Sequence, residues 1–478
     1  MSGGEWAERF ARARGRRPRV LHVGNVANNA YLNARLLNEA AVDNDVLGDG
    51  DYYMMASPEW EELDGEARGI DHERPNWRRV SSARFDRPRW FAQGPFPIAA
   101  AYLEARREGR ELSAALRWRQ LDVRRKAVAS GWSAAARRLR SVRAASAATD
   151  GPRDAARPDP SEDIGVYGAA RRWSPARLRR LFDHYDLVHG YGASPILPLV
   201  AGTHPYIAFE HGTLRHLPFQ PTVEGRLVAS AYTGADEVVI TNADCRTAAE
   251  ALGISRYRFI PHPINEARPT PASVVRLRDE LGQRLDADFL VFHPSRHHWG
   301  PDRNPHLEKG NDRLIHGLAR FFAQRPRAAA VFVDWGASAE ASRALLRDCG
   351  IAQRVQWIPP QTSMSLARHM MATDVTADQF HLGSFGSTMP RAMYLERPSL
   401  IHLDASAHAW CLPELPPVIN ARAAEEIANG LVWAYDDPAG RRELGARASR
   451  WYDQYHSSRV LQEALSALYD AVLSRRDQ

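Results

Sequence analysis

The stretch TDVTADQFHLGSFGSTMPRAMYLERPSLIH, residues 373–402, decides the fold class of this chain. Its pattern predicts a strand at 374–377, a loop rich in glycine and hydroxyl side chains at 383–388, a helix, and a second strand at 399–403. Pro390 is compatible with the first turn of that helix, because the N–H that proline lacks would have no partner there. A strand, a loop, a helix and a strand in this order predict an α/β domain with a parallel sheet.

The loop at 383–388 is a candidate phosphate site. Its residues are Gly383, Ser384, Phe385, Gly386, Ser387 and Thr388. The small residues let a ligand approach the backbone, the start of a helix presents unpaired N–H groups, and the hydroxyls add further donors. An ordinary strand-to-helix turn has the same composition, so the loop alone leaves both interpretations open.

Two cationic side chains upstream favour phosphate binding. An apolar strand at 290–293 leads to Arg296, and Lys309 comes just before an amphipathic helix. Both follow the carboxyl end of one predicted strand, so we expect them to face loop 383–388 and to clamp a diphosphate.

The motifs SR at 295–296, EKGNDRLI at 308–315 and DQFHLGSFGSTMPRAMYLERPSLI at 378–401 resemble the donor domain of GT-B glycosyltransferases of the family-4 type. The segment LHVGNVANNAYLNARLLNEA at 21–40 resembles the first loop and helix of such enzymes. The resemblance implies an α/β GT-B fold with two Rossmann-like, doubly wound domains facing a central cleft. It also implies metal-independent, retaining transfer from a nucleotide-sugar, which serves as co-substrate, with no other cofactor. Arg296 and Lys309 would hold the diphosphate of that donor.

One departure from the family concerns two glutamates. The family places one before the G-x-F-G loop and one at the start of the helix, where this chain has Gly383 and Arg391. The second glutamate usually meets the ribose hydroxyls; Arg391 cannot accept those hydrogen bonds but could pair with phosphate. Asp378 could supply a carboxylate from a shifted position. Asp378 and Arg391 therefore join the loop as candidate donor-binding residues.

The acceptor side is predicted from the first half of the chain. The turn after a first strand at 19–23 contains Gly24, Asn25, Asn28 and Asn29. Ligands of open α/β sheets bind beyond the carboxyl ends of the strands, which places this turn at the cleft. A helix cap is the alternative, although three asparagines exceed what one cap needs.

A later strand, within residues 205–213, ends at Glu210 and His211. The resemblance gives His211 the place of the family's acceptor-side histidine, which can hydrogen-bond a sugar hydroxyl at the reacting centre. His211 is therefore predicted to act with Arg296 and Lys309 in catalysis, and Glu210 is its neighbour on the acceptor side. A structural polar residue is the alternative at this position.

The chain is predicted to divide into an acceptor-side domain at 1–270 and a donor domain at 275–454, joined by a proline-rich run. Residues 358–360 stand where the family's backbone usually contacts the base. The last helix, within 455–478, is expected to pack back on the first domain. Strands of the donor domain are expected at 289–292, 329–334, 355–358, 374–377, 399–403 and 418–419.

A basic helical insertion is predicted within residues 88–165. Between 104 and 143 the chain carries twelve basic and four acidic residues, so this segment has a net charge of +8 while the whole chain has +6. Apolar residues recur at helical spacing over 128–142. A solvated helical face, contact with an anionic membrane surface and, least favoured, nucleic-acid binding are open.

The composition indicates a soluble globular protein of two domains, with 478 residues, 44% hydrophobic and 25% charged. The three cysteines are far apart and form no zinc or disulfide pattern. The D-x-D pairs at 43–45 and 49–51 are interpreted as turns, so no metal is expected. No long apolar run or hydrophobic leader is present, which predicts a cytoplasmic protein, with peripheral contact at the inner membrane face through 104–143 as an option.

Two other functions are open at this point. One is a nucleotide-sugar epimerase or hydrolase on the same fold. The other is a non-catalytic module that binds nucleotide-sugar or nucleic acid, because both glutamates are missing and one segment is basic. The motifs do not determine the sugar, the base or the acceptor, which could be a glycan, a lipid-linked saccharide or a small molecule.

Overall fold

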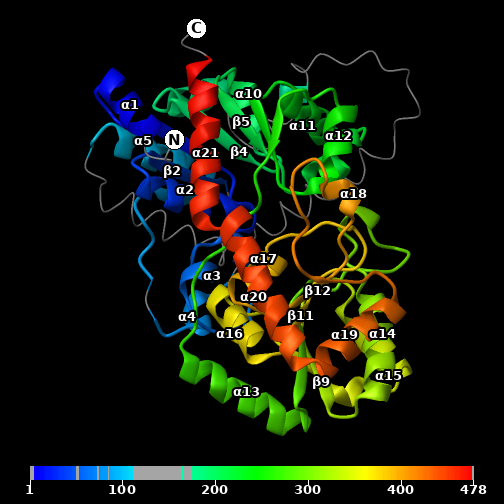
Figure 1. Cartoon of the computed structure of the whole chain (residues 1–478). Helices are drawn as coiled ribbons and strands as arrows, with labels where there is room; N and C mark the ends of the chain where they lie inside the picture. Colours follow the sequence, from blue (N-terminus) through cyan, green and yellow to red (C-terminus); the bar gives the residue numbers. More distant parts are fainter. Residues whose placement is uncertain are drawn as a thin grey trace.

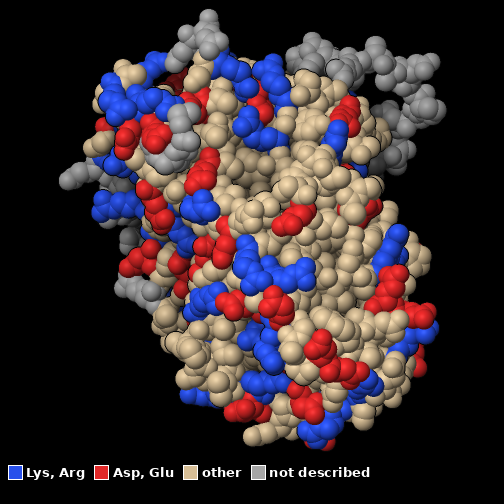
Figure 2. Space-filling view, viewed as in Figure 1, with Lys and Arg blue, Asp and Glu red and all other residues tan. Residues whose placement is uncertain are grey.

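The computed structural model describes residues 5–49, 53–72, 75–83, 85–110, 163–165 and 174–475. It consists of two lobes, each built around one parallel sheet, and Figure 1 shows the first lobe above the second. Figure 2 shows basic and acidic side chains interspersed over one face of both lobes. None of the helices in the described ranges is both long and apolar enough to cross a bilayer.

The first lobe contains a seven-stranded sheet in the order β3-β2-β1-β4-β5-β6-β7, in which every pair is parallel. Its strands are β1 (Arg19–Val23), β2 (Asp43–Asp49), β3 (Phe91–Gly94), β4 (Leu187–Tyr191), β5 (Tyr206–Phe209), β6 (Glu237–Ile240) and β7 (Tyr257–Phe259). Apolar side chains on both faces of the sheet are buried in two separate core clusters. This explains why strands such as β5, with the sequence YIAF, are continuous apolar runs.

Most helices of the first lobe cover the two faces of this sheet, and a short one, α3 (Glu59–Glu62), packs against the second lobe (Figure 1). The helices of this lobe are α1 (Glu5–Arg14), α2 (Asn29–Glu39), α3 (Glu59–Glu62), α4 (Trp77–Val80), α5 (Phe96–Arg107), α9 (Pro175–Phe182), α10 (Ile196–Ala201), α11 (Val223–Thr233) and α12 (Arg246–Ala251). Short 3-10 turns lie at η1 (Val26–Asn28), η2 (Met54–Ala56), η3 (Thr213–Arg215), η4 (Leu217–Phe219) and η5 (Ala243–Cys245).

The helix expected from residue 88 onward is wrong at its start. Phe91–Gly94 is strand β3, which pairs in parallel with β2 at the edge of the first sheet. The sequence FAQG has no β-branched residue and therefore carries little strand signal of its own. Burial of all four residues against the lobe makes it a strand. Helix α5 follows and ends at Arg107; the expected basic stripe lies in 111–162, outside the described residues.

The second lobe contains a six-stranded parallel sheet in the order β10-β9-β8-β11-β12-β13. Its strands are β8 (Phe289–His293), β9 (Ala328–Val333), β10 (Val355–Ile358), β11 (Val375–Ala377), β12 (Ser399–Ile401) and β13 (Ile419–Asn420). Its helices are α13 (Pro271–Leu285), α14 (Asn311–Gln324), α15 (Ala339–Asp348), α16 (Ser363–Ala372), α17 (Thr388–Tyr394), α18 (Ala405–His408), α19 (Ala424–Asp436) and α20 (Pro438–Tyr455), with 3-10 turns η6 (Pro305–Leu307) and η7 (Ala352–Arg354). The strand and helix alternation predicted for this half is therefore present, with shifts of one or two residues at the ends.

The last helix, α21 (Ser458–Ser474), lies on the first lobe (Figure 1). Leu461, Leu465 and Leu468 are buried in the same core cluster as strands β1 and β4. Tyr469 adds a polar contact, because its hydroxyl lies 2.8 Å from Nδ1 of the buried His189 in β4. The C-terminus thus ties the two lobes together through α20 and α21.

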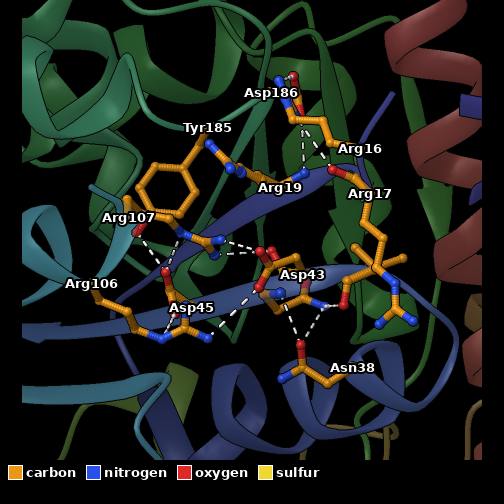
Figure 3. Close-up of polar contacts among 12 residues, drawn as sticks. Arg16, Arg17, Arg19, Asn38, Asp43, Asp45, Arg106, Arg107, Tyr185 and Asp186 are labelled. Atoms are coloured by element: carbon orange, nitrogen blue, oxygen red, sulfur yellow. Dashed lines mark hydrogen bonds and ion pairs between the residues drawn. The ribbon is translucent and has the colours of Figure 1, made fainter. Parts of the chain in front are cut away.

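The D-x-D pair at the start of β2 is part of an ion-pair cluster (Figure 3). Arg107 at the end of α5 binds both Asp43 and Asp45, the latter at 2.6 Å. Arg106 lies 3.4 Å from Asp45, and the hydroxyl of Tyr185 donates to the same carboxylate at 2.8 Å. Both carboxylates are therefore engaged by side chains of the lobe itself. Elsewhere among the described residues no cluster of three His, Cys, Asp or Glu side chains has the arrangement of a metal site.

Candidate functional site

The loop at 383–388 lies between β11 and α17, as the sequence predicts. Gly383 has φ of +71°, and a Cβ at this position would lie 2.9 Å from the Cβ of Asp404. A glutamate therefore does not fit where the family has one. Gly386 has open space around it. Helix α17 has only seven residues, so its dipole contributes little, and the loop depends on neighbouring side chains for positive charge.

Lys309 is held directly beside this loop. Its backbone N–H donates to the carbonyl of His298 at 2.8 Å, and its carbonyl accepts from the N–H of Phe380 at 2.7 Å. Its Nζ donates to Oε1 of Gln379 at 2.6 Å, and Nε2 of Gln379 donates to the carbonyl of Ser384. Gln379 thus connects the lysine to the loop, a role that the sequence analysis missed.

The charge of Lys309 is sensitive to its surroundings. Burial lowers its pKa to about 8, with contributions from the cations Arg215 and Arg296, while Asp378 opposes the shift. The chain contains 61 arginines and only two lysines, Lys309 and Lys126. Lys309 is therefore unusual among the cations of this protein, because its amine can lose its proton near neutral pH, whereas an arginine guanidinium stays charged.

Arg296 reaches the same place from the end of β8. Its side chain crosses Gly336, where a Cβ would lie 2.7 Å from Cγ of the arginine. Burial lowers the pKa of Arg296, and its Nε is buried with no hydrogen-bond partner among the described residues. The structure thus brings the two predicted cations together, since Arg296 lies close enough to Lys309 to help lower its pKa.

Asp378 lies close to Lys309 and is only 4% exposed. Its Oδ1 accepts from the hydroxyl of Ser295 at 2.6 Å, while its Oδ2 has no hydrogen-bond partner in the described part of the chain. Burial raises the pKa of this carboxyl, and Lys309 opposes the shift. Oγ of Ser384 is also buried and lies close to the carboxylate of Asp244. Buried polar atoms are normally paired, so the unpaired atoms of Arg296 and Asp378 make this a candidate place for a polar ligand.

His211 faces this group from the first lobe. Nδ2 of Asn29 donates to the carbonyl of Val26 at 2.8 Å and lies 3.2 Å from Nδ1 of His211. Because the carbonyl of Val26 fixes the orientation of the amide, His211 accepts at Nδ1 and carries its proton on Nε2. Burial lowers the pKa of His211 to about 4, aided by Arg215 and Lys309, so the ring is a neutral donor at pH 7.

A second ring supports this arrangement. Nδ1 of His262 lies 3.2 Å from Oδ1 of Asn29, and its ring packs edge-on against His211 with centroids 4.6 Å apart. Nε2 of His456, which directly follows α20, lies 2.9 Å from the carbonyl of His262. Residues from distant parts of the chain therefore orient His211.

Three of the predicted acceptor-side residues have internal partners. Nδ2 of Asn25 donates to the carbonyl of Ala56 at 2.9 Å, and Nδ2 of Asn28 donates to that of Ser57 at 2.9 Å. Oε2 of Glu210 accepts hydrogen bonds from the residues that follow β6. These side chains shape the site from behind. Gly24 lets the side chain of Ser194 approach its backbone closely, since a Cβ at Gly24 would lie 2.4 Å from Oγ of Ser194.

Two of the predicted donor-side residues also face the protein interior. Phe385 is 3% exposed and stacks on His408, with ring centroids 5.5 Å apart. Arg391 is 4% exposed; it donates to Ser363 and lies 3.9 Å from Oε2 of Glu61 in the first lobe. The guanidinium of Arg391 is thus already paired within the protein.

A pocket opens next to the loop, between the lobes. It is partly open to solvent. Tyr53 and Trp60 line it from the first lobe, and Trp335 and Pro360 from the second. Ser387, Thr388 and Arg391 line it as well, so the pocket is continuous with the predicted phosphate loop.

A pair from the first lobe completes the polar surroundings. Arg215 donates to Asp244 through Nε at 2.6 Å and Nη2 at 2.9 Å. Arg215 holds the pKa of Asp244 below its usual value although burial would raise it. The sequence analysis missed Arg215, Asp244, His262 and Trp60. A lone arginine in a loop carries no motif, and only its position opposite Lys309 makes it part of the site.

Comparison with known proteins identifies the architecture. No family model matches the sequence, and no curated protein matches it. Anabaena HepE in complex with UDP and glucose is similar in structure with a TM-score of 0.53, at 17% identity over 64% of this chain and 84% of that one. Sucrose-phosphate synthase from Thermosynechococcus elongatus gives 0.53, at 13% identity over 96% of this chain and all of its own.

A glycosyltransferase from Rickettsia africae gives a TM-score of 0.52, at 9% identity over 95% of this chain and 98% of that one. Together with the two parallel sheets, these similarities confirm the α/β class and the GT-B fold that the sequence predicts. At such low identities they establish the fold and leave the activity to be argued from the site.

Proposed function

We propose that this GT-B chain is a glycosyltransferase that moves a sugar from a nucleoside-diphosphate sugar to an acceptor hydroxyl. The observation that carries the proposal is the gathering of Lys309, Arg296 and Asp378 beside a glycine loop, with buried atoms of Arg296 and Asp378 that have no hydrogen-bond partner among the described residues. Structures of HepE in complex with UDP and with UDP-glucose support the choice of donor, since they share the fold.

The chemistry follows from the charges. Transfer breaks the bond between the anomeric carbon and a phosphate oxygen, and the departing diphosphate gains negative charge. Lys309 and Arg296 stabilise that charge more strongly in the transition state than in the ground state, which is the condition for faster chemistry. The N–H groups and hydroxyls of the loop at 383–388 provide additional donors.

The acceptor side uses His211. Its neutral ring presents the Nε2 proton as a hydrogen-bond donor, and Asn29 keeps the ring in that tautomer. A neutral ring can hold a sugar hydroxyl in place by this hydrogen bond. It adds no positive charge that would be repelled by Arg296 and Lys309 at the nucleotide-sugar site. The resemblance to family-4 enzymes further implies retention of the anomeric configuration, which NMR of the product tests.

Turnover of a panel of nucleotide-sugars, with and without cell extract as the source of acceptor, tests the proposal. We expect the nucleotide-sugar to be consumed only when the cell extract that supplies the acceptor is present. Donor loss without acceptor would instead indicate a hydrolase or epimerase, and binding without any turnover would indicate a binding module. We further propose that turnover persists in EDTA, because two cations already face the leaving group; loss that magnesium or manganese restores would contradict this.

Membrane contact through 104–143 remains a proposal based on charge. Two cations of this segment, Arg106 and Arg107, already pair with Asp43 and Asp45. An anionic surface would attract the remaining positive charge of the segment, and salt would weaken the attraction, because it screens surface charges within about 10 Å. Sedimentation with anionic liposomes at low and high salt measures it, and the absence of binding at low salt contradicts it.

A further inference from the structure

Part of the first lobe belongs spatially to the second. Residues 53–67, here named the cross-lobe segment, lie between β2 and β3 in sequence but bond to the turn after β10. The N–H of Ala67 donates to the carbonyl of Pro360 at 2.7 Å, and the N–H of Thr362 donates to that of Gly65 at 3.1 Å. Figure 1 shows α3, within this segment, beside α16 of the second lobe.

Apolar contacts and asparagines fix the segment at both ends. Met54, Trp60 and Ala67 form a small core cluster, against which Leu366 of α16 packs. At the other end, the carbonyls that precede α3 accept the amides of Asn25 and Asn28 described above. The segment is therefore held to the β1–α2 turn and to the second lobe at once.

Trp60 holds the central position in this contact. Its Nε1 donates to the carbonyl of Gln361 at 3.0 Å, and the guanidinium of Arg391 lies over its ring at 5.5 Å from the centroid. Trp60 is 5% exposed, and its ring forms part of the pocket wall. Trp335 is another aromatic side chain of the same pocket, on the second lobe.

The pocket has the chemistry of a nucleoside site. Aromatic walls suit a planar heterocycle, since stacked rings add to the energy of burial. Ser387 and Thr388 of the predicted phosphate loop line the same pocket, so a ring held there would lie next to that loop. Arg391 of the second lobe lines the pocket, and its guanidinium lies 3.9 Å from Glu61 of the first lobe.

We infer that Trp60, a first-lobe residue, sets the affinity for the nucleoside part of the donor by closing this pocket against the second lobe. The inference rests on the proposed function, from which the donor class is taken. It assigns donor recognition to both lobes, whereas the sequence motifs place it in the second half alone.

Calorimetric titration of the full chain separates the two proposals. Uridine, adenosine and guanosine are titrated together with their diphosphates. Trp60→Ala is expected to weaken the binding of the nucleoside and the binding of its diphosphate by the same factor, tenfold or more. Lys309→Ala is expected to weaken binding of the diphosphate alone, because the nucleoside has no phosphate with which the lysine could pair.

Two further variants keep the test interpretable. Trp60→Phe retains a ring but lacks the bond to Gln361, and is expected to give a smaller loss with an intact fold. Trp433→Ala, the control, alters a tryptophan of α19 that is 39% exposed. It should leave the affinities for all six compounds unchanged. If the wild type binds and both Trp60 variants bind equally well, this inference is wrong. If the wild type binds none of the six compounds, both proposals fail.

Discussion

At the scale of single residues, Lys309 combines a fixed position with an adjustable charge. Hydrogen bonds at its N–H and carbonyl hold its backbone, Gln379 holds its Nζ, and burial brings its pKa down to about 8. A protonated amine stabilises a departing diphosphate, and a neutral amine does not. The pH dependence of turnover should therefore report on this residue.

We predict that kcat/KM for the donor falls as pH rises through about 8, because Lys309 then loses its proton. Lys309→Arg should move this limb to higher pH, since a guanidinium stays charged. Initial rates between pH 6.5 and 9.5 measure both profiles. An alkaline limb that is unchanged in Lys309→Arg would show that another group titrates there.

Loop 383–388 offers a matched pair of glycines. Gly383→Ala should lower the free energy of unfolding by about 1–3 kcal/mol, because its φ of +71° and its contact with Asp404 leave no room for a side chain. Gly386→Ala should change it by no more than about 0.5 kcal/mol, since nothing lies near its Cβ position. Urea unfolding compares the two, and equal losses would contradict the prediction.

At the scale of elements, the ion-pair cluster of Figure 3 attaches the end of α5 to β2. The side chain of Arg107 is 2% exposed and that of Asp45 is fully buried, whereas Arg106 is 27% exposed. Removing Arg107 would leave the buried Asp45 with only the more distant Arg106 and the Tyr185 hydroxyl as partners, and weakening a buried pair in this way costs more than the loss of an exposed pair.

Arg107→Ala is therefore predicted to lower the free energy of unfolding by about 3 kcal/mol or more, and Arg106→Ala by about 1 kcal/mol or less. The two arginines are adjacent on one helix, so helix propensity affects both variants alike. Denaturant unfolding at one pH measures the difference. A larger loss for Arg106→Ala would mean that the buried carboxylate depends on the outer arginine.

At the scale of the whole molecule, histidines are buried in both lobes. Burial lowers the pKa values of His22, His211, His293 and His456 to about 4. Below about pH 6.5 the unfolded chain binds protons at these rings and the folded chain does not. Stability is therefore complete above that pH and is lost as the pH falls towards 4.

We predict that the free energy of unfolding falls steadily from pH 7 to pH 5, by up to about 1.4 kcal/mol per pH unit for each such histidine. His22→Gln should make this slope shallower by about one proton, because glutamine can still bond to Tyr191 and Asn44, the neighbours of His22, and does not titrate. Urea unfolding at three pH values gives the slope. A slope that His22→Gln leaves unchanged would contradict the assignment.

The chain by itself determined the features that are encoded locally. The alternation of apolar strands with amphipathic helices predicted a parallel sheet and most strands of the second lobe, and the order of strand, loop and helix located 383–388. The GT-B fold itself was implied by the resemblance of the motifs to family-4 enzymes. The sequence also predicted that Arg296 and Lys309 lie near loop 383–388, because both follow the carboxyl end of one strand. β3 was missed because FAQG has little strand propensity and is a strand only through its pairing with β2.

Only the tertiary structure decided which side chains meet. Trp60 bonds to Gln361 across 301 positions of sequence, and Asn29 reaches both His211 and His262. It also showed that Asn25 and Asn28 are engaged within the protein, and that Gly383 has no room for the family's glutamate. The physical reason is that pattern and propensity act between neighbours in sequence, whereas a site depends on distances and burial that exist only after both lobes have packed.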